Sequence, residues 1–66
     1  MKNSLKVERA IRNITQEELA REIGVTRQAI NSIELGKFVP STVLALRLSK
    51  YFGKPVNDLF SLEEGD

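Results

Sequence analysis

Apolar residues recur along the chain at spacings of three and four, which is the repeat of a helix with one buried face. Alternation of apolar and polar residues, the pattern of a half-buried strand, never continues beyond a few positions. The pattern therefore predicts an all-α domain, a compact five-helix bundle. We expect helices over residues 5–12, 16–23, 27–35 and 42–52, and a short fifth helix that begins at Pro55 and includes Phe60.

Residues typical of helix ends separate these segments. Thr15-Gln16-Glu17-Glu18 is a capping box, in which the Thr15 hydroxyl accepts a hydrogen bond from the Glu18 amide and the Glu18 carboxylate accepts one from the Thr15 amide. Thr26 and Ser41 are N-caps of the third and fourth helices. Glycines suited to a left-handed backbone end the second, third and fourth helices: Gly24, Gly36 and Gly53.

The apolar positions also predict which side chains are buried. The fourth helix is apolar nearly all round, so we expect it to be central. The acidic tail, residues 61–66, is expected to fray. The apolar positions of the first helix are Leu5, Val7, Ala10 and Ile11. The aromatic residues are interpreted as core residues: Phe38, Tyr51, Phe52 and Phe60.

Composition restricts the possible chemistry. Sixty-six residues suffice for one domain, 1–66, with no room for a separate ligand-binding domain. The chain has no cysteine and no histidine, which excludes disulfides, thiolate or imidazole metal sites and Ser/His or Cys/His nucleophiles. Capping already explains the carboxylates of the second helix. We therefore expect no enzymatic activity, no metal and no cofactor.

Charge is distributed unevenly although the net charge is only +1. Residues 1–54 hold all ten Lys and Arg but five of the nine acids, and residues 55–66 hold the other four acids. A basic body with an acidic tail favours a polyanion as partner, although charges solvated on helix surfaces would give the same count. No signal peptide or membrane-spanning run is present, so we expect a cytoplasmic protein that does not contact the membrane.

Residues 16–34 meet the steric demands of a helix-turn-helix. Ala20 is small where the two helices would cross, and Gly24 permits the turn between them. An ordinary helical hairpin would need only the apolar spacing, so this combination favours the DNA-binding form. The interior of the motif is predicted to contain Leu19, Ile23, Val25, Ile30 and Ile33.

The third helix of such a motif enters the major groove of double-stranded DNA. Arg27, Gln28, Asn31 and Ser32 lie off the Ile30/Ile33 face and are predicted to contact bases. Gln28 is the strongest candidate, because its amide can form two hydrogen bonds with adenine. Arg27 can contact either guanine or a phosphate.

The segment Ile14-Thr15-Gln16-Glu17-Glu18-Leu19-Ala20 resembles the Leu-Thr-Gln-x-Glu-Leu-Ala hallmark of the Cro/phage-repressor, or XRE-type, helix-turn-helix family. Further matches, at 24–25, 33–34, 36–37, 40–41 and 58–60, extend the resemblance over about residues 4–60. It implies a repressor-like five-helix domain. It also implies a sequence-specific transcriptional regulator that binds a roughly palindromic operator as a homodimer.

The resemblance implies further residue roles. Gln16 is expected to bind a DNA phosphate from the start of the second helix, with Thr26 and Lys37 as further phosphate ligands. Lys37 can instead interact with the carboxyl end of the third helix. Arg9 and Glu34 correspond to a structural ion pair. The apolar residues near the carboxyl end are assigned to the dimer interface: Val56, Leu59, Phe60 and Leu62.

The chain departs from the family pattern at several positions. Asn13 replaces a glycine, Lys54 an apolar residue and Pro55 a Ser or Thr cap, and Glu8 stands where an apolar residue is usual. We expect Glu8 to pair with Arg12 or to lie against a partner chain. An alternative function is an antitoxin or adaptor that binds mainly another protein, with secondary DNA binding. A neighbouring toxin gene would favour that alternative.

Overall fold

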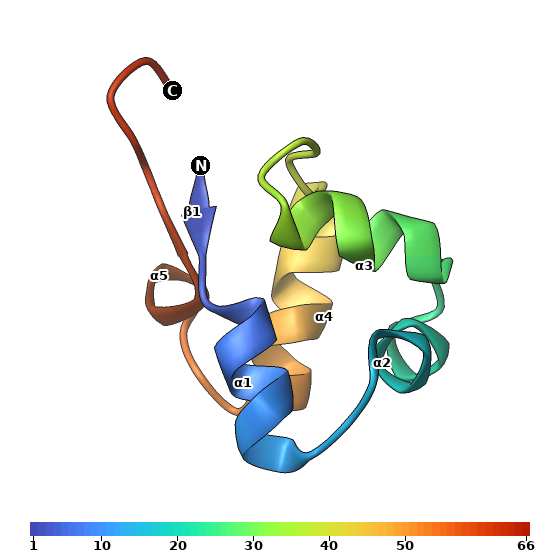
Figure 1. Ribbon diagram of the computed structural model, residues 1–66. Coiled ribbons are helices and arrows are strands. Elements are labelled where there is room, and N and C mark those ends of the chain that lie inside the picture. The colour runs from blue at the N-terminus through green and yellow to red at the C-terminus, as the bar shows by residue number, and fades with distance from the viewer.

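A computed structural model describes all 66 residues, and it is a five-helix domain as the sequence predicts. The elements are β1 (Lys2–Asn3), α1 (Leu5–Arg12), α2 (Gln16–Ile23), α3 (Arg27–Glu34), α4 (Thr42–Phe52), α5 (Val56–Leu59) and β2 (Phe60–Ser61). In Figure 1, α3 lies across the upper part of the molecule, with α4 behind it and both chain ends at the upper left. The first four helices match the predicted ranges to within one residue, whereas Phe60 belongs to a strand and not to the fifth helix.

The helix ends form as the sequence predicts. Thr15 and Glu18 make both hydrogen bonds of the capping box, 3.0 and 3.1 Å long. The Thr26 and Ser41 hydroxyls accept hydrogen bonds from backbone amides in the first turns of α3 and α4. Gly24 ends α2 with φ +83°, a left-handed conformation in which a side chain would be strained. These caps allow helices of only eight residues to begin and end at defined positions.

The core lies between α4 and the other helices. In α4 the buried side chains are Leu44, Leu48 and Phe52. The fourth helix is therefore central as predicted, although Val43 and Leu46 are exposed. A chain of this length has too few elements to cover a helix completely. The whole buried apolar cluster is Leu5, Leu19, Ala20, Ile23, Ile30, Ile33, Leu44, Leu48, Phe52, Leu59 and Phe60.

The first helix is oriented differently from the prediction. Its buried residues are Leu5 and Glu8, whereas Val7, Ala10 and Ile11 are exposed. The Glu8 side chain, 9% exposed, contacts the Lys54 ammonium at 2.7 Å, so the predicted pairing with Arg12 is wrong, and a contact with a partner chain stays a prediction. The ion pair joins α1 to the segment between α4 and α5, and Val7 and Ile11 of the same helix face solvent.

The two chain ends form a short antiparallel ribbon that the sequence analysis did not predict. Lys2 pairs with Ser61 and Asn3 with Phe60. The Met1 amino group contacts the carboxylates of Glu63 at 3.1 Å and Asp66 at 3.2 Å. The hydrogen bond with Glu63 is the main reason that the pKa of this amino group is raised. The fraying of the exposed tail stays a prediction.

Candidate nucleic-acid interface

The surface of α3 results from the way it packs on α2. Leu19, Ala20 and Ile23 of α2 and Ile30 and Ile33 of α3 are buried, which confirms these predicted interior positions of the helix-turn-helix. Val25, in the turn, is half-buried. With its apolar face buried, α3 directs its remaining side chains outward: Arg27, Gln28 and Asn31 are exposed and Ser32 is half-buried. The four predicted base-contacting residues therefore occupy one accessible helix.

A hydrogen-bonded network fixes α3 relative to α1 and α2. Arg9 Nε and Nη2 donate to the two carboxylate oxygens of Glu34 at 2.6 and 2.9 Å, which confirms the predicted ion pair. Arg9 Nη1 also donates to the Ile14 carbonyl. The Arg9 and Glu34 side chains are only 14% and 6% exposed. Their hydrogen bonds raise the pKa of Arg9 above its ordinary value. Arg9 therefore remains charged, and its contact with Glu34 orients the carboxyl end of α3.

Gln16 joins the same network. Its Nε2 donates to Glu34 Oε1 and to Asn31 Oδ1, both at 3.1 Å. A primary amide has only two N–H donors, so both are already used. A phosphate bound by the Gln16 side chain would have to replace one of these acceptors, and Asn31 is the more exposed of the two. Asn31 would then be free to turn toward a base.

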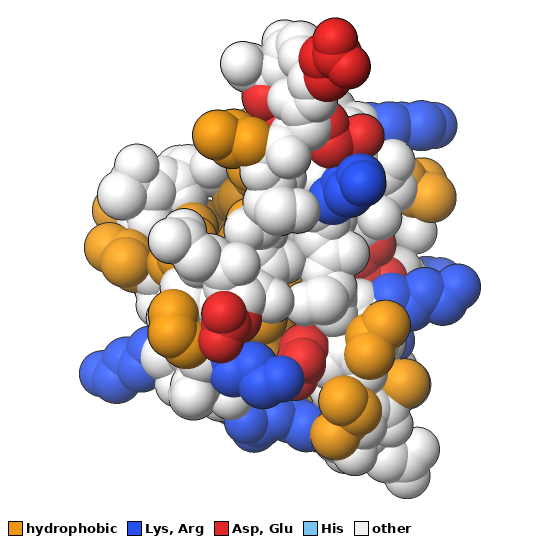
Figure 2. Space-filling view, turned by 90° about the vertical axis from the view of Figure 1, so that its left-hand side faces the viewer, with side chains coloured by type: hydrophobic (Ala, Val, Ile, Leu, Met, Phe, Trp, Pro, Cys, Tyr) orange, Lys and Arg blue, Asp and Glu red, His pale blue; other side chains and the backbone are white.

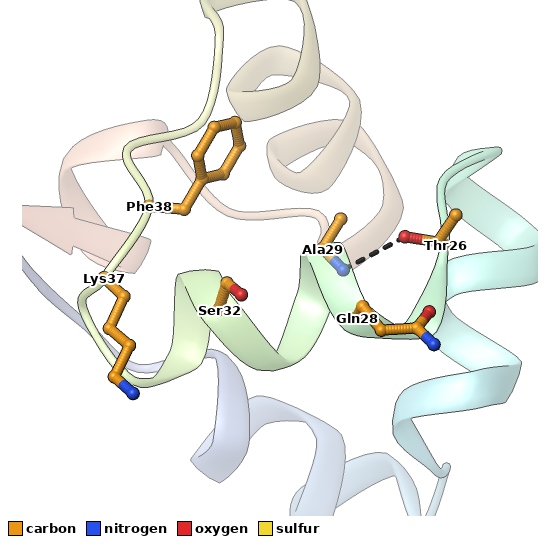
Figure 3. Close-up of a pocket in the computed structure, with 6 residues that line it drawn as sticks. All are labelled: Thr26, Gln28, Ala29, Ser32, Lys37 and Phe38. Atoms are coloured by element: carbon orange, nitrogen blue, oxygen red, sulfur yellow. Dashed lines mark hydrogen bonds between the residues drawn. The ribbon is translucent and has the colours of Figure 1, made fainter.

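The other two predicted phosphate ligands lie near the two ends of α3. Thr26 uses its hydroxyl to cap the helix, accepting from the Ala29 amide at 3.1 Å. Lys37 is exposed and follows the turn at Gly36. Both line a shallow hollow of about 380 Å³ beside α3, which Figure 3 shows in close-up. The complete lining is Thr26, Gln28, Ala29, Ser32, Lys37 and Phe38.

Phe38 is the residue at this surface that the sequence analysis misplaced. Its interpretation as a core aromatic is wrong, because its side chain is 51% exposed. The other three aromatic residues are buried or half-buried. The position of Phe38 in the sequence indicates its exposure, since it comes two residues after the glycine that ends α3. The chain there has already left the packed face of the helix.

The four residues assigned to a dimer interface divide into two groups. Leu59 and Phe60 are buried in the core of the chain itself, whereas Val56 is half-buried and Leu62 is exposed. Val56 and the edge of Phe60 line an apolar groove together with the exposed Val39 and Leu46. In Figure 2, hydrophobic side chains reach the surface on this side of the molecule, and acidic side chains gather at the top, at the carboxyl end.

No group of three or more His, Cys, Asp or Glu residues is placed to hold a metal ion. None of the five helices combines the length and the apolar character that crossing a membrane requires.

Comparison with known proteins gives consistent matches over nearly the whole chain. A family model described as helix-turn-helix matches residues 5–59. An uncharacterized HTH-type transcriptional regulator of Methanocaldococcus jannaschii is 48% identical over 66 residues, covering 100% of both chains. One of Bacillus subtilis is 47% identical over 97% of both chains. The HTH-type transcriptional activator BcrR of Enterococcus faecalis is 40% identical over 80% of this chain and 26% of its own length.

Proposed function

Because the chain belongs to the helix-turn-helix family of DNA-binding transcriptional regulators, we propose that it binds a specific double-stranded operator in the cytoplasm and regulates transcription there. The observation that carries the proposal is the outward face of α3. Polar side chains are held there at fixed positions, because the opposite face of the helix is buried against α2. A rigid helix with one free polar face suits the major groove.

In this proposal the amino-terminal end of α3 lies deepest in the groove. Gln28 forms two hydrogen bonds with an adenine, and Arg27 contacts a guanine or a neighbouring phosphate. Asn31 and Ser32 contact bases one turn further along. Gln16, Thr26 and Lys37 bind phosphates on either side and set the position of α3, without selecting a sequence themselves.

Binding to duplex DNA is expected to weaken steeply as salt increases. Each phosphate neutralised by Lys or Arg contributes about −0.9 to the slope of log affinity against log salt. A fluorescence-anisotropy titration between about 50 and 200 mM salt measures this slope. A slope near zero, or no duplex binding at low salt, would contradict the proposed function.

Replacement of Gln28 tests which residue reads the sequence. We expect Gln28→Ala to lose about 1 to 3 kcal/mol of binding free energy per half-site and to relax the preference at one symmetric pair of operator positions. Folding should be retained, since Gln28 is exposed and alanine favours helix more than glutamine does. Selection of sites from random duplexes, repeated with the variant, shows the change in preference.

Lys37→Ala is the matched control, because Lys37 lines the same hollow but is assigned to a phosphate. It should weaken binding to all sequences equally and make the salt slope shallower by about one unit per subunit. If Gln28→Ala gives this same uniform loss, then Gln28 binds the backbone and the assignment fails.

We also propose that the regulator binds a roughly palindromic operator as a homodimer. One helix-turn-helix reads few base pairs, and two-fold symmetry would place two copies of α3 about 34 to 36 Å apart, one helical turn along the DNA. The proposed interface includes Val56 and Leu62, two of the four interface residues predicted from the sequence. It adds the exposed Val39 and Leu46, which continue the apolar groove. Phe60 also lines the groove, whereas Leu59 is buried in the core.

Sedimentation at micromolar concentration tests the dimer. We expect the unmodified chain to be a dimer and Leu46→Glu to be a monomer with weaker operator binding, because a carboxylate would be buried at the interface. Val7→Glu is the control: Val7 is similarly exposed but lies on α1, outside the groove. A chain that is monomeric both free and on its operator would refute the dimer. Phe60 is a less suitable site for this test, because its side chain is buried in the core and Phe60→Asp would disturb folding.

A protein-binding antitoxin or adaptor is the second candidate function. The observation in its favour is the pair of exposed apolar residues on α1, Val7 and Ile11, which the proposed DNA surface and dimer groove leave uncovered. Such a module would bind DNA tightly only in complex with its partner protein. High-affinity operator binding by the purified chain alone would favour the autonomous regulator.

A further inference from the structure

The backbone of Phe38 is hydrogen-bonded to α3, and its ring is half in solvent. The Lys37 and Phe38 amides both donate to the Ser32 carbonyl, at 2.9 and 3.2 Å. Gly36, with φ +75°, makes the turn that brings them there. The backbone of the loop is therefore fastened to the last turn of α3, and the ring lines the hollow beside that helix. An exposed aromatic side chain beside a polar helix face is typical of a contact surface.

The hollow beneath this ring is apolar where it adjoins α3. In Figure 3 the Phe38 ring, the Ala29 methyl and the Thr26 side chain stand on the same side of the helix. The Thr26 hydroxyl oxygen accepts the capping hydrogen bond, which leaves its O–H available to a phosphate and its methyl group as an apolar part of the lining. Gln28 and Ser32 supply polar groups, Lys37 the one charge, and no carboxylate lines the hollow.

We propose that this hollow binds the 5-methyl group of a thymine that adjoins the adenine contacted by Gln28. The inference rests on the proposed function and specifies part of the operator. In the major groove the methyl group of thymine is the only apolar group that a natural base presents. Alanine, threonine methyl and phenylalanine are the side chains that contact it well, and all three types line the hollow. Phe38 is thus a specificity-determining residue.

The expected effect follows from the burial of one methyl group. Burial of one carbon with its hydrogens contributes about 0.8 kcal/mol, which corresponds to roughly fourfold in affinity per half-site. Removal of the methyl from both half-sites of a palindrome should therefore cost roughly fifteenfold in affinity.

The test exchanges single methyl groups in the DNA. The best operator is first selected from random duplexes. Each thymine is then replaced in turn by deoxyuridine, which keeps the base pair and removes only the methyl. We expect one symmetric pair of thymines at which this replacement weakens binding by the stated amount. A cytosine placed at that position should bind better when it carries a 5-methyl group.

Protein variants test whether the affinity difference between thymine and deoxyuridine operators arises from the hollow. Phe38→Ala should lower affinity for the thymine operator and bring the thymine-to-deoxyuridine affinity ratio close to one, with Lys37→Ala leaving the ratio intact. Circular dichroism melts of each variant check folding. Deoxyuridine tolerated at every position of a specifically bound operator would overturn the inference, as would a Phe38→Ala loss that is equal for both operators. Absence of any preferred duplex would instead refute the proposed function itself.

Discussion

Replacement of Arg9 by methionine is expected to lower the free energy of unfolding by about 3 to 5 kcal/mol, the typical cost of stranding a buried charge. The Glu34 carboxylate, 6% exposed, would keep only the hydrogen bond from Gln16. A domain of this size rarely has more than about 3 to 5 kcal/mol of stability, so most of the variant should be unfolded. Urea denaturation followed by circular dichroism measures the loss.

Arg21→Met is the matched control for this experiment. Arg21 lies on α2, is exposed and makes no ion pair, so its replacement should change stability by less than about 0.5 kcal/mol. The loss of stability in Arg9→Lys should lie between those of Arg9→Met and Arg21→Met. Lysine keeps the charge but cannot form the two hydrogen bonds that Arg9 donates to Glu34. An Arg9→Met chain as stable as the control would show that the ion pair contributes little.

The second large effect concerns Glu8 and Lys54. Lys54→Met should destabilise the chain by about 2 kcal/mol, since it leaves the buried Glu8 carboxylate without its partner. The loss is smaller than for Arg9 because Lys54 is 44% exposed and water already reaches the pair. The double variant Glu8→Leu with Lys54→Met should regain the original stability or exceed it, as apolar replacements of a buried pair often do.

A double-mutant cycle measures the coupling between these two residues. We expect a coupling energy of at least about 1 kcal/mol, obtained from urea denaturation of the parent, both single variants and the double variant. Lys50→Met serves as the control, because Lys50 is exposed and forms no ion pair in the structure. Additive effects of Glu8→Leu and Lys54→Met would mean that the observed contact contributes no stability.

Features determined by local sequence were the predictable ones. The capping box at Thr15, the caps at Thr26 and Ser41 and the turn at Gly24 depend on residues a few positions apart. The face of α3 followed from them, because once a helix begins at a known residue its period fixes which side chains share a side. The Arg9–Glu34 ion pair, between residues 25 positions apart, was predicted through the family resemblance alone.

Features that depend on distant contacts were missed. Glu8 and Lys54 were both noted as unusual, but 46 positions separate them and no local pattern indicates that they meet. In α1, Glu8 is buried whereas Val7 and Ile11 face solvent, which the apolar positions of the helix did not indicate. The β1–β2 ribbon consists of two-residue strands, which are too short to show any alternation. Phe38 was misplaced because aromatic residues are usually buried.

The ribbon at the chain ends has a consequence for the proposed dimer. Met1 lines the same apolar groove as Leu46 and Val56, so that groove is complete only while the two ends are paired. A second subunit would bind chains in this state. The apparent affinity of the dimer would therefore be proportional to the fraction of chains whose two ends are paired. Separation of the two chain ends would thus oppose dimer formation. The fraction of operator that is bound would then depend on the pairing of the chain ends, although these ends contact no base.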